Sequence, residues 1–408
     1  MLLVASTAAA IFLLARRVSA KKKHPVAIVA AETHTSTRGL GVAKVPVTVL
    51  GMGGASIGDM YVKISNAQAV QTLEAAHAHG VTFFDTSPWY GVGLSEARFG
   101  IALHSVPRDS FFLQTKVGRY LVPDSDGVNG TKLGWIGGFH FGIRFDYSKE
   151  GFQRQLEDSL QRTGLGRIDS LVIHDLEPTP RNGTQEEKIE LAMQDLRVLE
   201  KSGYDYLVAQ RAAGKILTFG AGVNSNEDGE DLRLKREYNK MYVNKLVELH
   251  KTRGEIDFLL LANMWSLLNF EAFEDGILQL CSKNGISVVV GGPYSSGILA
   301  TGADPEHGGV PYYNYMPADN TVRERCRRVE QVCKRFGVPL IAAAIQFPLL
   351  HPSVCSVIPG GKSKWEVDSN VKNMNFPIPL ALWYALRNEG LLPLSLKLPP
   401  MPRRRRNE

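Results

Sequence analysis

Short, almost continuously apolar runs alternate with amphipathic stretches along the chain from about residue 40 onward. Such runs, rich in β-branched and aromatic residues, are typical of parallel strands that are covered on both faces. We expect strands at eight of them, namely 45–54, 82–87, 110–117, 169–176, 216–223, 257–264, 286–293 and 354–361.

The stretches between these runs carry helix signals. In the first of them Ser65 is a candidate N-cap, apolar residues follow at helical spacing, and Gly80 is a stop. The same pattern begins at Ser148 and ends near Gly164. It occurs again over 271–285. A helix is therefore predicted in each of these connections.

The order strand, helix, strand recurs eight times and predicts an α/β fold, a (β/α)8 barrel, because parallel strands need crossovers and eight of them close naturally. An open doubly wound sheet is the alternative, but LGMGGASIG after the first run lacks the GxGxxG spacing. Three connections are long, at 118–147, 224–253 and 298–320. Loops of this length in a barrel tend to form lids or walls of the substrate site. We expect one barrel domain over 41–395 with long βα loops and a C-terminal helical extension.

Both ends of the chain differ from this body. Residues 1–40 begin with an apolar run, and a basic tail covers 396–408. The tails contain nine positive charges, at Arg16, Arg17, Lys21, Lys22, Lys23, Arg403, Arg404, Arg405 and Arg406. Together with Glu408 they give the tails a charge of +8. The net charge of the whole chain is +6, so the rest of the chain is near −2, which argues against nucleic-acid binding.

The apolar N-terminal run is interpreted as an anchor, a targeting segment or a disordered segment. Its positive charges follow the run, so insertion into a membrane would keep the body in the cytosol. We expect a cytoplasmic protein, with membrane association or organelle targeting through residues 1–23 as the alternative. Four cysteines without paired or CxxC spacing predict reduced thiols and no metal site: Cys281, Cys326, Cys333 and Cys355.

Ionisable residues stand at the ends of three predicted strands. Asp85, Lys116 and His174 lie at the carboxyl ends, where such barrels carry their active sites, and Tyr90 follows Asp85 closely. Each alone has an ordinary explanation, such as a cap, a rim aromatic, a surface lysine or a buried histidine. Together they suit proton transfer at a carbonyl or hydroxyl beside a nicotinamide. A lysine ammonium lowers the pKa of the tyrosine, the aspartate keeps the lysine charged, and the histidine orients the substrate oxygen.

Four segments in this order, FFDTSPWYGVGLSEARFG, LQTKVG, LVIHD and VIPGGKSKWEVDSNV, resemble the aldo-keto reductase superfamily. The resemblance covers roughly residues 45–390 and implies that Asp85, Tyr90, Lys116 and His174 form a catalytic tetrad. Tyr90 would be its general acid and base.

A narrower resemblance is carried by VPVTVLGMGGASIGDMY, GFQRQLEDSLQRTGLGRIDSLVIHD and GGPYSSGILATG. These segments are similar to the D-threo-aldose 1-dehydrogenase (L-fucose dehydrogenase) and L-galactose dehydrogenase branch. The likeness implies oxidation of C1 of a free aldose, of L-fucose, D-arabinose or L-galactose type, to the aldonolactone.

The resemblance also implies a bound NAD or NADP across the strand ends. The contacts implied are Gly53, Asp85, Asn224, Trp265, Tyr294, Ser295, Ser296, Gly297, Pro359, Gly360, Gly361, Lys362, Glu366 and Asn370. Glu366 stands where NADP-preferring reductases have an arginine, which favours NAD, whereas Lys362 and Lys364 favour NADP. The glutamine that usually meets the carboxamide aligns with Ala262, so Asn263 or Asn224 is the candidate replacement.

Two other functions stay open at this point. One is an NADPH-dependent aldehyde or pyridoxal reductase that uses the same tetrad in the other direction. The other is a non-catalytic regulator, because potassium-channel β subunits resemble this fold. For a small sugar substrate, the loop aromatics that could stack on its ring are Trp135, Phe139, Phe141, Tyr312 and Tyr313. The sequence leaves the oligomeric state open.

Overall fold

The computed structural model describes residues 32–123, 135–178, 182–225, 232–306 and 308–401. The apolar N-terminal run and most of the basic tail, for which an anchor and a charged extension were predicted, lie outside these residues. In the described part, no single helix is long and apolar enough to cross a membrane, although the bent pair Asn320–Arg335 and Leu340–Leu350 has a suitable length and composition.

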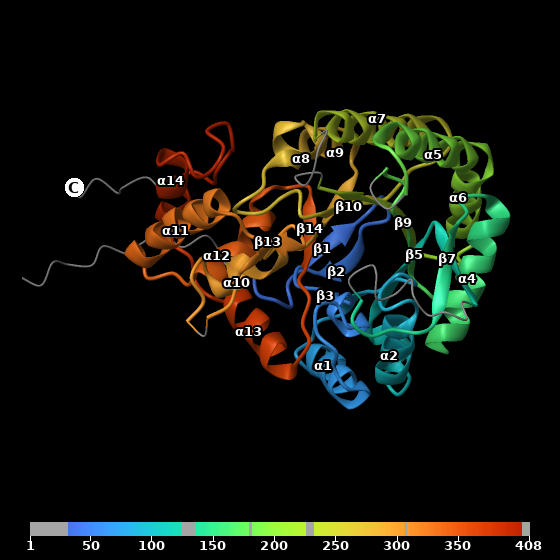
Figure 1. Cartoon of the computed structure of the whole chain (residues 1–408), viewed down its shortest axis with the longest axis horizontal. Helices are drawn as coiled ribbons and strands as arrows, with labels where there is room; N and C mark the ends of the chain where they lie inside the picture. Colours follow the sequence, from blue (N-terminus) through green and yellow to red (C-terminus); the bar gives the residue numbers. More distant parts are fainter. Residues whose placement is uncertain (1–31, 124–134, 179–181, 226–231, 307, 402–408) are drawn as a thin grey trace, which may run out of the picture.

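Eight parallel strands form the centre of the molecule, as predicted (Figure 1). They are β3 (Met52–Gly53), β4 (Phe83–Asp85), β5 (Phe112–Val117), β8 (Ser170–Ile173), β9 (Thr218–Asn224), β10 (Phe258–Ala262), β11 (Ser287–Gly291) and β14 (Val354–Ile358). Neighbouring strands pair in this order, and parallel bridges at Leu50–Val357 and Gly53–Gly360 join the first strand to the last. The sheet therefore closes into a (β/α)8 barrel.

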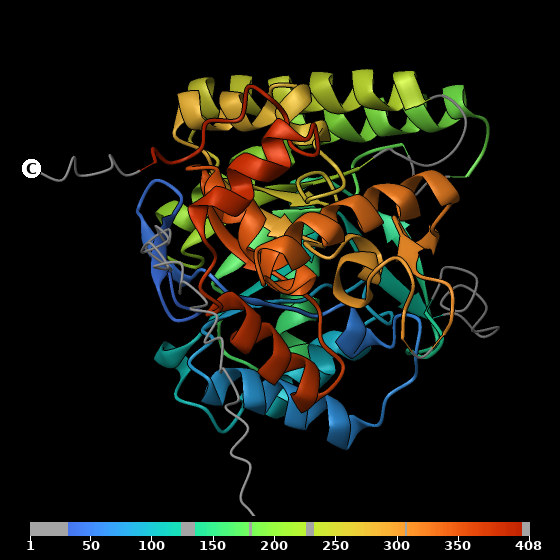
Figure 2. The ribbon, with the colours of Figure 1, turned by 90° about the vertical axis from the view of Figure 1, so that its left-hand side faces the viewer.

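Helices cover the outside of the barrel (Figure 1). Around the first half lie α1 (Asn66–Ala78), α2 (Leu94–Leu103), α4 (Lys149–Thr163), α5 (Gln185–Val198) and α6 (Tyr204–Ala212). The second half has α7 (Leu232–Thr252), α8 (Glu271–Glu274), α9 (Ile277–Asn284), α10 (Ile298–Thr301), α11 (Asn320–Arg335), α12 (Leu340–Gln346) and α13 (Lys364–Met374). The extension α14 (Leu380–Asn388) packs on α11, and Figure 2 shows these C-terminal helices over one side of the barrel.

The predicted helix caps are confirmed. The Ser65 hydroxyl accepts a hydrogen bond from Gln68 N at 3.1 Å, and that of Ser148 accepts one from Gly151 N at 3.0 Å. Gly164 ends α4 in the left-handed conformation that glycine adopts without strain. These local signals are readable from sequence because each acts within one turn of the helix.

The first predicted strand, 45–54, is wrong as a single element. Residues Val45–Thr48 form β2, which pairs antiparallel with β1 (Thr37–Leu40) in a separate hairpin, and only Met52–Gly53 forms a barrel strand, with Leu50 bridged to Val357. Apolar side chains of this hairpin, Leu40 and Val47, pack against Phe83 and its neighbours at the start of the strands. The hairpin therefore covers the amino-terminal end of the barrel, and the folded part begins before residue 41.

All three long connections contain regular structure that the sequence reading missed; in 298–320 it is α10 and two short strands, Tyr312–Tyr313 and Met316–Pro317. Within 118–147, β6 (Arg119–Pro123) and β7 (Phe141–Phe145) form an antiparallel hairpin. Within 224–253, residues 232–252 are the helix α7 rather than a loop. Its buried Tyr238, Tyr242 and Leu246, four residues apart, are a helical signal that the many charged residues around them obscure.

Candidate active site

A buried lysine–aspartate pair lies at the carboxyl ends of β4 and β5. The Lys116 ammonium is 2.7 Å from Asp85 Oδ1 and donates to the Thr86 carbonyl at 2.8 Å. The amide of Gln114 donates to the same carboxylate oxygen at 2.6 Å. Only 2% of the Lys116 side chain and 3% of the Asp85 side chain are exposed, so each charge depends on the other.

Tyr90 and His174 lie beside this pair. The Lys116 ammonium sits over the Tyr90 ring, 4.6 Å from the ring centroid, and the His174 ring stands perpendicular to it at 6.3 Å between centroids. The backbone of Tyr90 lies close against Gly58: a Cβ on Gly58 would come within 2.5 Å of the Tyr90 carbonyl carbon. The structure thus brings together the four residues that the sequence singled out.

The electrostatics of the site differ from the prediction. Burial, reinforced by the Asp85 carboxylate, raises the pKa of the Tyr90 phenol well above its ordinary value, instead of Lys116 lowering it. The reason is geometric, since the ammonium faces the ring and its charge is balanced by Asp85. Burial lowers the pKa of Lys116, whereas Asp85 raises it. With these neighbours the phenol carries its proton at neutral pH.

His174 is neutral at physiological pH. Burial lowers the pKa of its imidazole well below the ordinary value, and the positive charges of Arg119 and Lys116 lower it further. Its Nδ1 is buried and has no hydrogen-bond partner among the described residues. A neutral imidazole offers one N–H donor and one acceptor, which suits a group that orients a substrate oxygen without charging it.

A cavity of about 450 Å³ opens above Tyr90. Nine of the predicted cofactor contacts line it: Gly53, Asp85, Tyr294, Ser296, Gly297, Gly360, Lys362, Glu366 and Asn370. Two residues of the tetrad, Asp85 and Tyr90, therefore share the cavity with residues of the loops after β11 and β14. Ser295, Pro359 and Gly361 belong to the same loops without lining it, and Ser295 Oγ is 2.8 Å from Ser266 Oγ instead.

Two predicted contacts lie elsewhere. Trp265 is fully buried in the core, with its ring 4.6 Å from that of Phe347 and its N–H donated to the Pro348 carbonyl. The amide of Asn224 turns away from the cavity and donates to Asp175 at 3.1 Å and to Glu177 at 3.2 Å. Both residues lie at or just after the end of a strand. Whether such a side chain reaches the cavity depends on its direction, which is set by packing.

Several cavity residues escaped the sequence reading. Tyr61 and Tyr315 line the cavity from two different loops, and Tyr315 N donates to Ser296 Oγ at 2.9 Å. Trp365, at the first turn of α13, also lines it and is 74% exposed. Tyr61 and Trp365 lie in segments that carry the family resemblance but were not assigned to the site, and the short hairpin of β12 (Tyr312–Tyr313) and β13 (Met316–Pro317) brings Tyr315 to the cavity.

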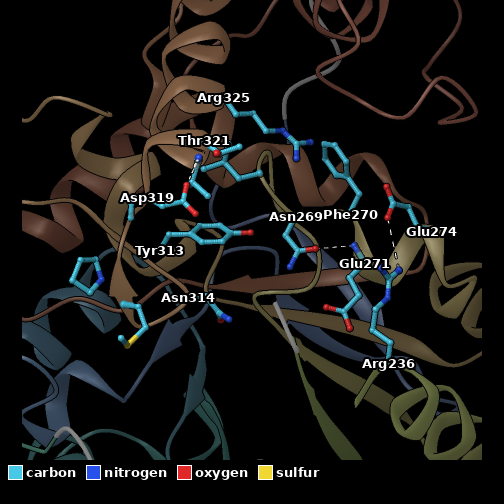
Figure 3. Close-up of a pocket in the computed structure, with 15 residues that line it drawn as sticks. Arg236, Asn269, Phe270, Glu271, Glu274, Tyr313, Asn314, Asp319, Thr321 and Arg325 are labelled. Carbon is cyan, nitrogen blue, oxygen red and sulfur yellow. Dashed lines mark hydrogen bonds and ion pairs between the residues drawn. The ribbon is translucent and has the colours of Figure 1, made fainter. Parts of the chain in front are cut away.

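The predicted sugar-stacking aromatics are dispersed. Trp135 packs against Tyr90 with 5.7 Å between ring centroids, and Tyr312 packs against Tyr61 at 5.6 Å. Phe139 and Phe141 contact each other. Tyr313 faces a second cavity of about 490 Å³, opposite Asn269 and Glu271 (Figure 3). No tetrad residue lines this second cavity, so the chemistry belongs to the cavity above Tyr90.

Comparison with known proteins agrees with this geometry. A sequence model of the aldo/keto reductase family matches residues 49–386. The chain belongs to this family. Pyridoxal 4-dehydrogenase of Microbacterium luteolum is 33% identical over 87% of the chain and 97% of that protein. D-threo-aldose 1-dehydrogenase of a Pseudomonas species is 30% identical, over 86% and 96%.

Solved structures show the same fold. An aldo-keto reductase from Bacillus halodurans in its holo form has a TM-score of 0.60 and 22% identity, covering 89% of this chain and 98% of that one. L-galactose dehydrogenase of Arabidopsis thaliana is 25% identical over 83% of the chain and 88% of that protein. The protein is therefore an NAD(P)-dependent oxidoreductase of the aldo/keto reductase family.

The cavity of this aldo/keto reductase fits a nicotinamide dinucleotide. Asn263 follows β10 and lines the cavity, and its Oδ1 is buried without a hydrogen-bond partner among the described residues. A buried amide oxygen left without a donor is costly, and a carboxamide N–H of nicotinamide would satisfy it. Of the two asparagines that were candidates for the missing glutamine, the structure places only Asn263 in the cavity.

Replacing Asn263 with alanine is expected to weaken cofactor binding about tenfold, because one hydrogen bond to a buried amide is lost. Quenching of tryptophan fluorescence on titration with NAD and NADP measures the dissociation constants. Asn284→Ala, on α9, removes an amide that bonds only within its own helix and serves as the control. Unchanged affinity in Asn263→Ala would show that the carboxamide is held by another group.

Proposed function

We propose that the protein oxidises C1 of a free aldose to the aldonolactone, with NAD(P) as hydride acceptor. The observation that carries the proposal is the position of Tyr90, which lines the cavity beside the buried Lys116–Asp85 pair. D-threo-aldose 1-dehydrogenase and L-galactose dehydrogenase among the relatives support the substrate class.

Each residue of the site has a separate role in this reaction. Tyr90, as the phenolate, takes the proton of the anomeric hydroxyl, with the Lys116 ammonium beside its ring. The neutral imidazole of His174 orients the same oxygen as it becomes a carbonyl. A bound nicotinamide, with Asn263 at its carboxamide, would supply the hydride acceptor for C1. The proton then leaves Tyr90 for solvent, and because burial raises the pKa of Tyr90, oxidation is favoured at alkaline pH.

Pyridoxal is the second candidate substrate, because a pyridoxal 4-dehydrogenase is 33% identical to the chain. Pyridoxal carries an aldehyde next to a hydroxymethyl group and closes to a cyclic hemiacetal, as aldoses do. The same tetrad would oxidise either ring to a lactone. The reverse activity, NADPH-dependent reduction of an aldehyde, needs the protonated tyrosine that the buried site favours at neutral pH.

One assay separates these candidates. NADH and NADPH formation is followed at mildly alkaline pH with L-fucose, D-arabinose, L-galactose and pyridoxal, and aldehyde reduction by NADPH is followed in parallel. Turnover of at least one aldose at a higher kcat/KM than pyridoxal supports the proposal. Pyridoxal oxidation alone would replace the aldose, and aldehyde reduction alone would assign the reductase function.

We further propose NAD as the preferred cofactor. The Glu366 carboxylate lines the adenosine end of the cavity and accepts a hydrogen bond from Lys362 N at 2.7 Å. Its negative charge repels a 2′-phosphate but accepts a hydrogen bond from a ribose hydroxyl. The Lys362 ammonium, 3.8 Å from the other carboxylate oxygen, partly balances that charge.

Glu366→Arg is expected to shift the ratio of kcat/KM for NAD over NADP at least tenfold toward NADP, since a repelling charge becomes an attracting one. Both cofactors are compared under saturating substrate. Glu366→Gln, which removes the charge without adding a cation, should give an intermediate ratio. An unchanged ratio in both variants would exclude Glu366 as the discriminating residue.

A further inference from the structure

Arg119 is a buried cation that the tetrad does not include. It follows Gly118, which has φ +128°, and a Cβ on that glycine would come within 2.6 Å of the His174 carbonyl oxygen. The chain therefore turns sharply at the end of β5 and brings Arg119 next to the active site. Only 2% of its side chain is exposed.

Aromatic rings and one carboxylate surround the guanidinium. Its central carbon lies 4.5 Å from the centroid of the Trp89 ring and 5.0 Å from that of Phe145. Rings of this kind stabilise a cation only in part, so a buried arginine needs a negative partner. The partner is Asp175, with which Arg119 forms an ion pair.

Asp175 in turn faces the catalytic histidine. Its Oδ1 is 3.3 Å from Nε2 of His174, and the Asn224 amide donates to the same oxygen at 3.1 Å. The backbone of Asp175 is left-handed, with φ +52°, and the Tyr147 hydroxyl lies 2.8 Å from the carbonyl oxygens of both His174 and Asp175. This uncommon conformation turns the carboxylate back toward the imidazole.

We propose that Arg119 is a positioning residue of the active site, which holds Asp175 against His174 and sets the pH range in which histidine and tyrosine act together. The inference rests on the proposed oxidation, because it concerns the proton path of that reaction. Arg119 itself touches no reacting atom in this arrangement. It acts through Asp175 and through the field of its charge.

The direction of the effect follows from the charges that face each group. His174 is faced by Arg119, Lys116 and Asp175; burial lowers the pKa of its imidazole most, and the two cations lower it further. Tyr90 is faced by Asp85, Lys116, His174, Tyr315 and Arg119. Among these, the Arg119 charge lowers the pKa of Tyr90, whereas Asp85 and Tyr315 raise it. Without the Arg119 charge, the Asp175 carboxylate 3.3 Å from His174 Nε2 would favour the imidazolium more strongly, and the phenolate would lose a cation that stabilises it.

Removing the positive member of the ion pair and removing its negative member are therefore expected to shift the pKa of His174 in opposite directions. In Arg119→Gln the pKa of His174 is expected to rise by about one unit or more. The pH profile of kcat/KM for oxidation should move to higher pH. In Asp175→Asn the unopposed cation should lower the pKa of His174 further and move the profile to lower pH. Arg119→Lys retains the charge and should restore most of the wild-type profile.

The titration of His174 is measured in the complete protein without substrate, by NMR of ¹⁵N-labelled histidine, with the resonance assigned from a His174→Gln spectrum. This readout does not depend on which substrate is turned over, so its failure is distinguishable from a wrong substrate assignment. Arg108→Gln is the control, because it breaks an arginine–aspartate pair with Asp169 that precedes β8, at the other end of that strand.

Shifts of opposite sign in Arg119→Gln and Asp175→Asn, with cofactor affinity within about threefold of wild type, support the proposal. If His174 titrates in both variants as it does in the control, the proposal is overturned. Shifts of the same sign in the two variants would also overturn it, because they indicate loosened packing. If Arg119→Gln does not fold, the titrations of His174 in Arg119→Lys and Asp175→Asn test the proposal. A wild-type-like titration in Asp175→Asn then overturns the proposal.

Discussion

Tyr90→Phe is expected to reduce kcat about 10³-fold or more while the dissociation constant for the cofactor stays within about twofold. The substitution removes one hydroxyl and leaves the ring between Lys116 and Trp135 in place. In the proposed mechanism the hydroxyl takes the proton from the substrate. Lys116 is charged and paired with Asp85, and burial makes the His174 imidazole a weak base, so neither of them replaces it.

Steady-state turnover and fluorescence quenching by the cofactor test this prediction together. Tyr315→Phe is a matched control, since it removes a second phenol hydroxyl from the same cavity wall. It should lower kcat far less than Tyr90→Phe. A loss of cofactor affinity in parallel with kcat would contradict the role of Tyr90, because it would show that the phenol holds the cofactor rather than the proton.

The strands and the tetrad could be predicted because their signals are local. Runs of apolar residues mark strands that are buried on both faces, and the barrel fold dictates that their carboxyl ends share one face. Asp85, Lys116 and His174 were therefore placed together by topology alone. Tyr90 needed only a short glycine-flanked turn to join them. The charge balance was not predictable, because it depends on whether the ammonium faces the hydroxyl or the ring of Tyr90.

The features that could not be predicted from the sequence depend on side-chain direction or on contacts between residues that are far apart in the chain. Asn224 and Asn263 both follow strands, yet one points to Asp175 and the other into the cavity. Trp265 was assigned to the cofactor by position, but its ring fills the core beside Phe347. Arg119 went unnoticed because a basic residue after a strand is ordinary, and only folding brings Asp175 to it.

Lys116→Met and Asp85→Asn are each expected to lower the free energy of unfolding by about 3–5 kcal/mol, because each leaves a buried charge without its partner. Both variants should also lose about 10²- to 10⁴-fold in kcat, since the proton transfer at Tyr90 loses the charge beside it. In Asp85→Asn the lysine loses the group that raises its pKa, so burial drives it toward the neutral amine. Chemical denaturation and turnover measure the two effects.

The double variant Lys116→Met/Asp85→Asn separates stability from catalysis. It contains no uncompensated charge, so its free energy of unfolding should recover toward that of wild type, well above the sum of the single losses. Its kcat should stay as low as that of Lys116→Met, because the ammonium is still missing. Arg211→Met, which breaks a less buried pair with Asp257 ahead of β10, should lower stability without lowering kcat. Recovery of activity together with stability in the double variant would show that the pair only supports the fold, and that Tyr90 transfers its proton without help from a neighbouring cation.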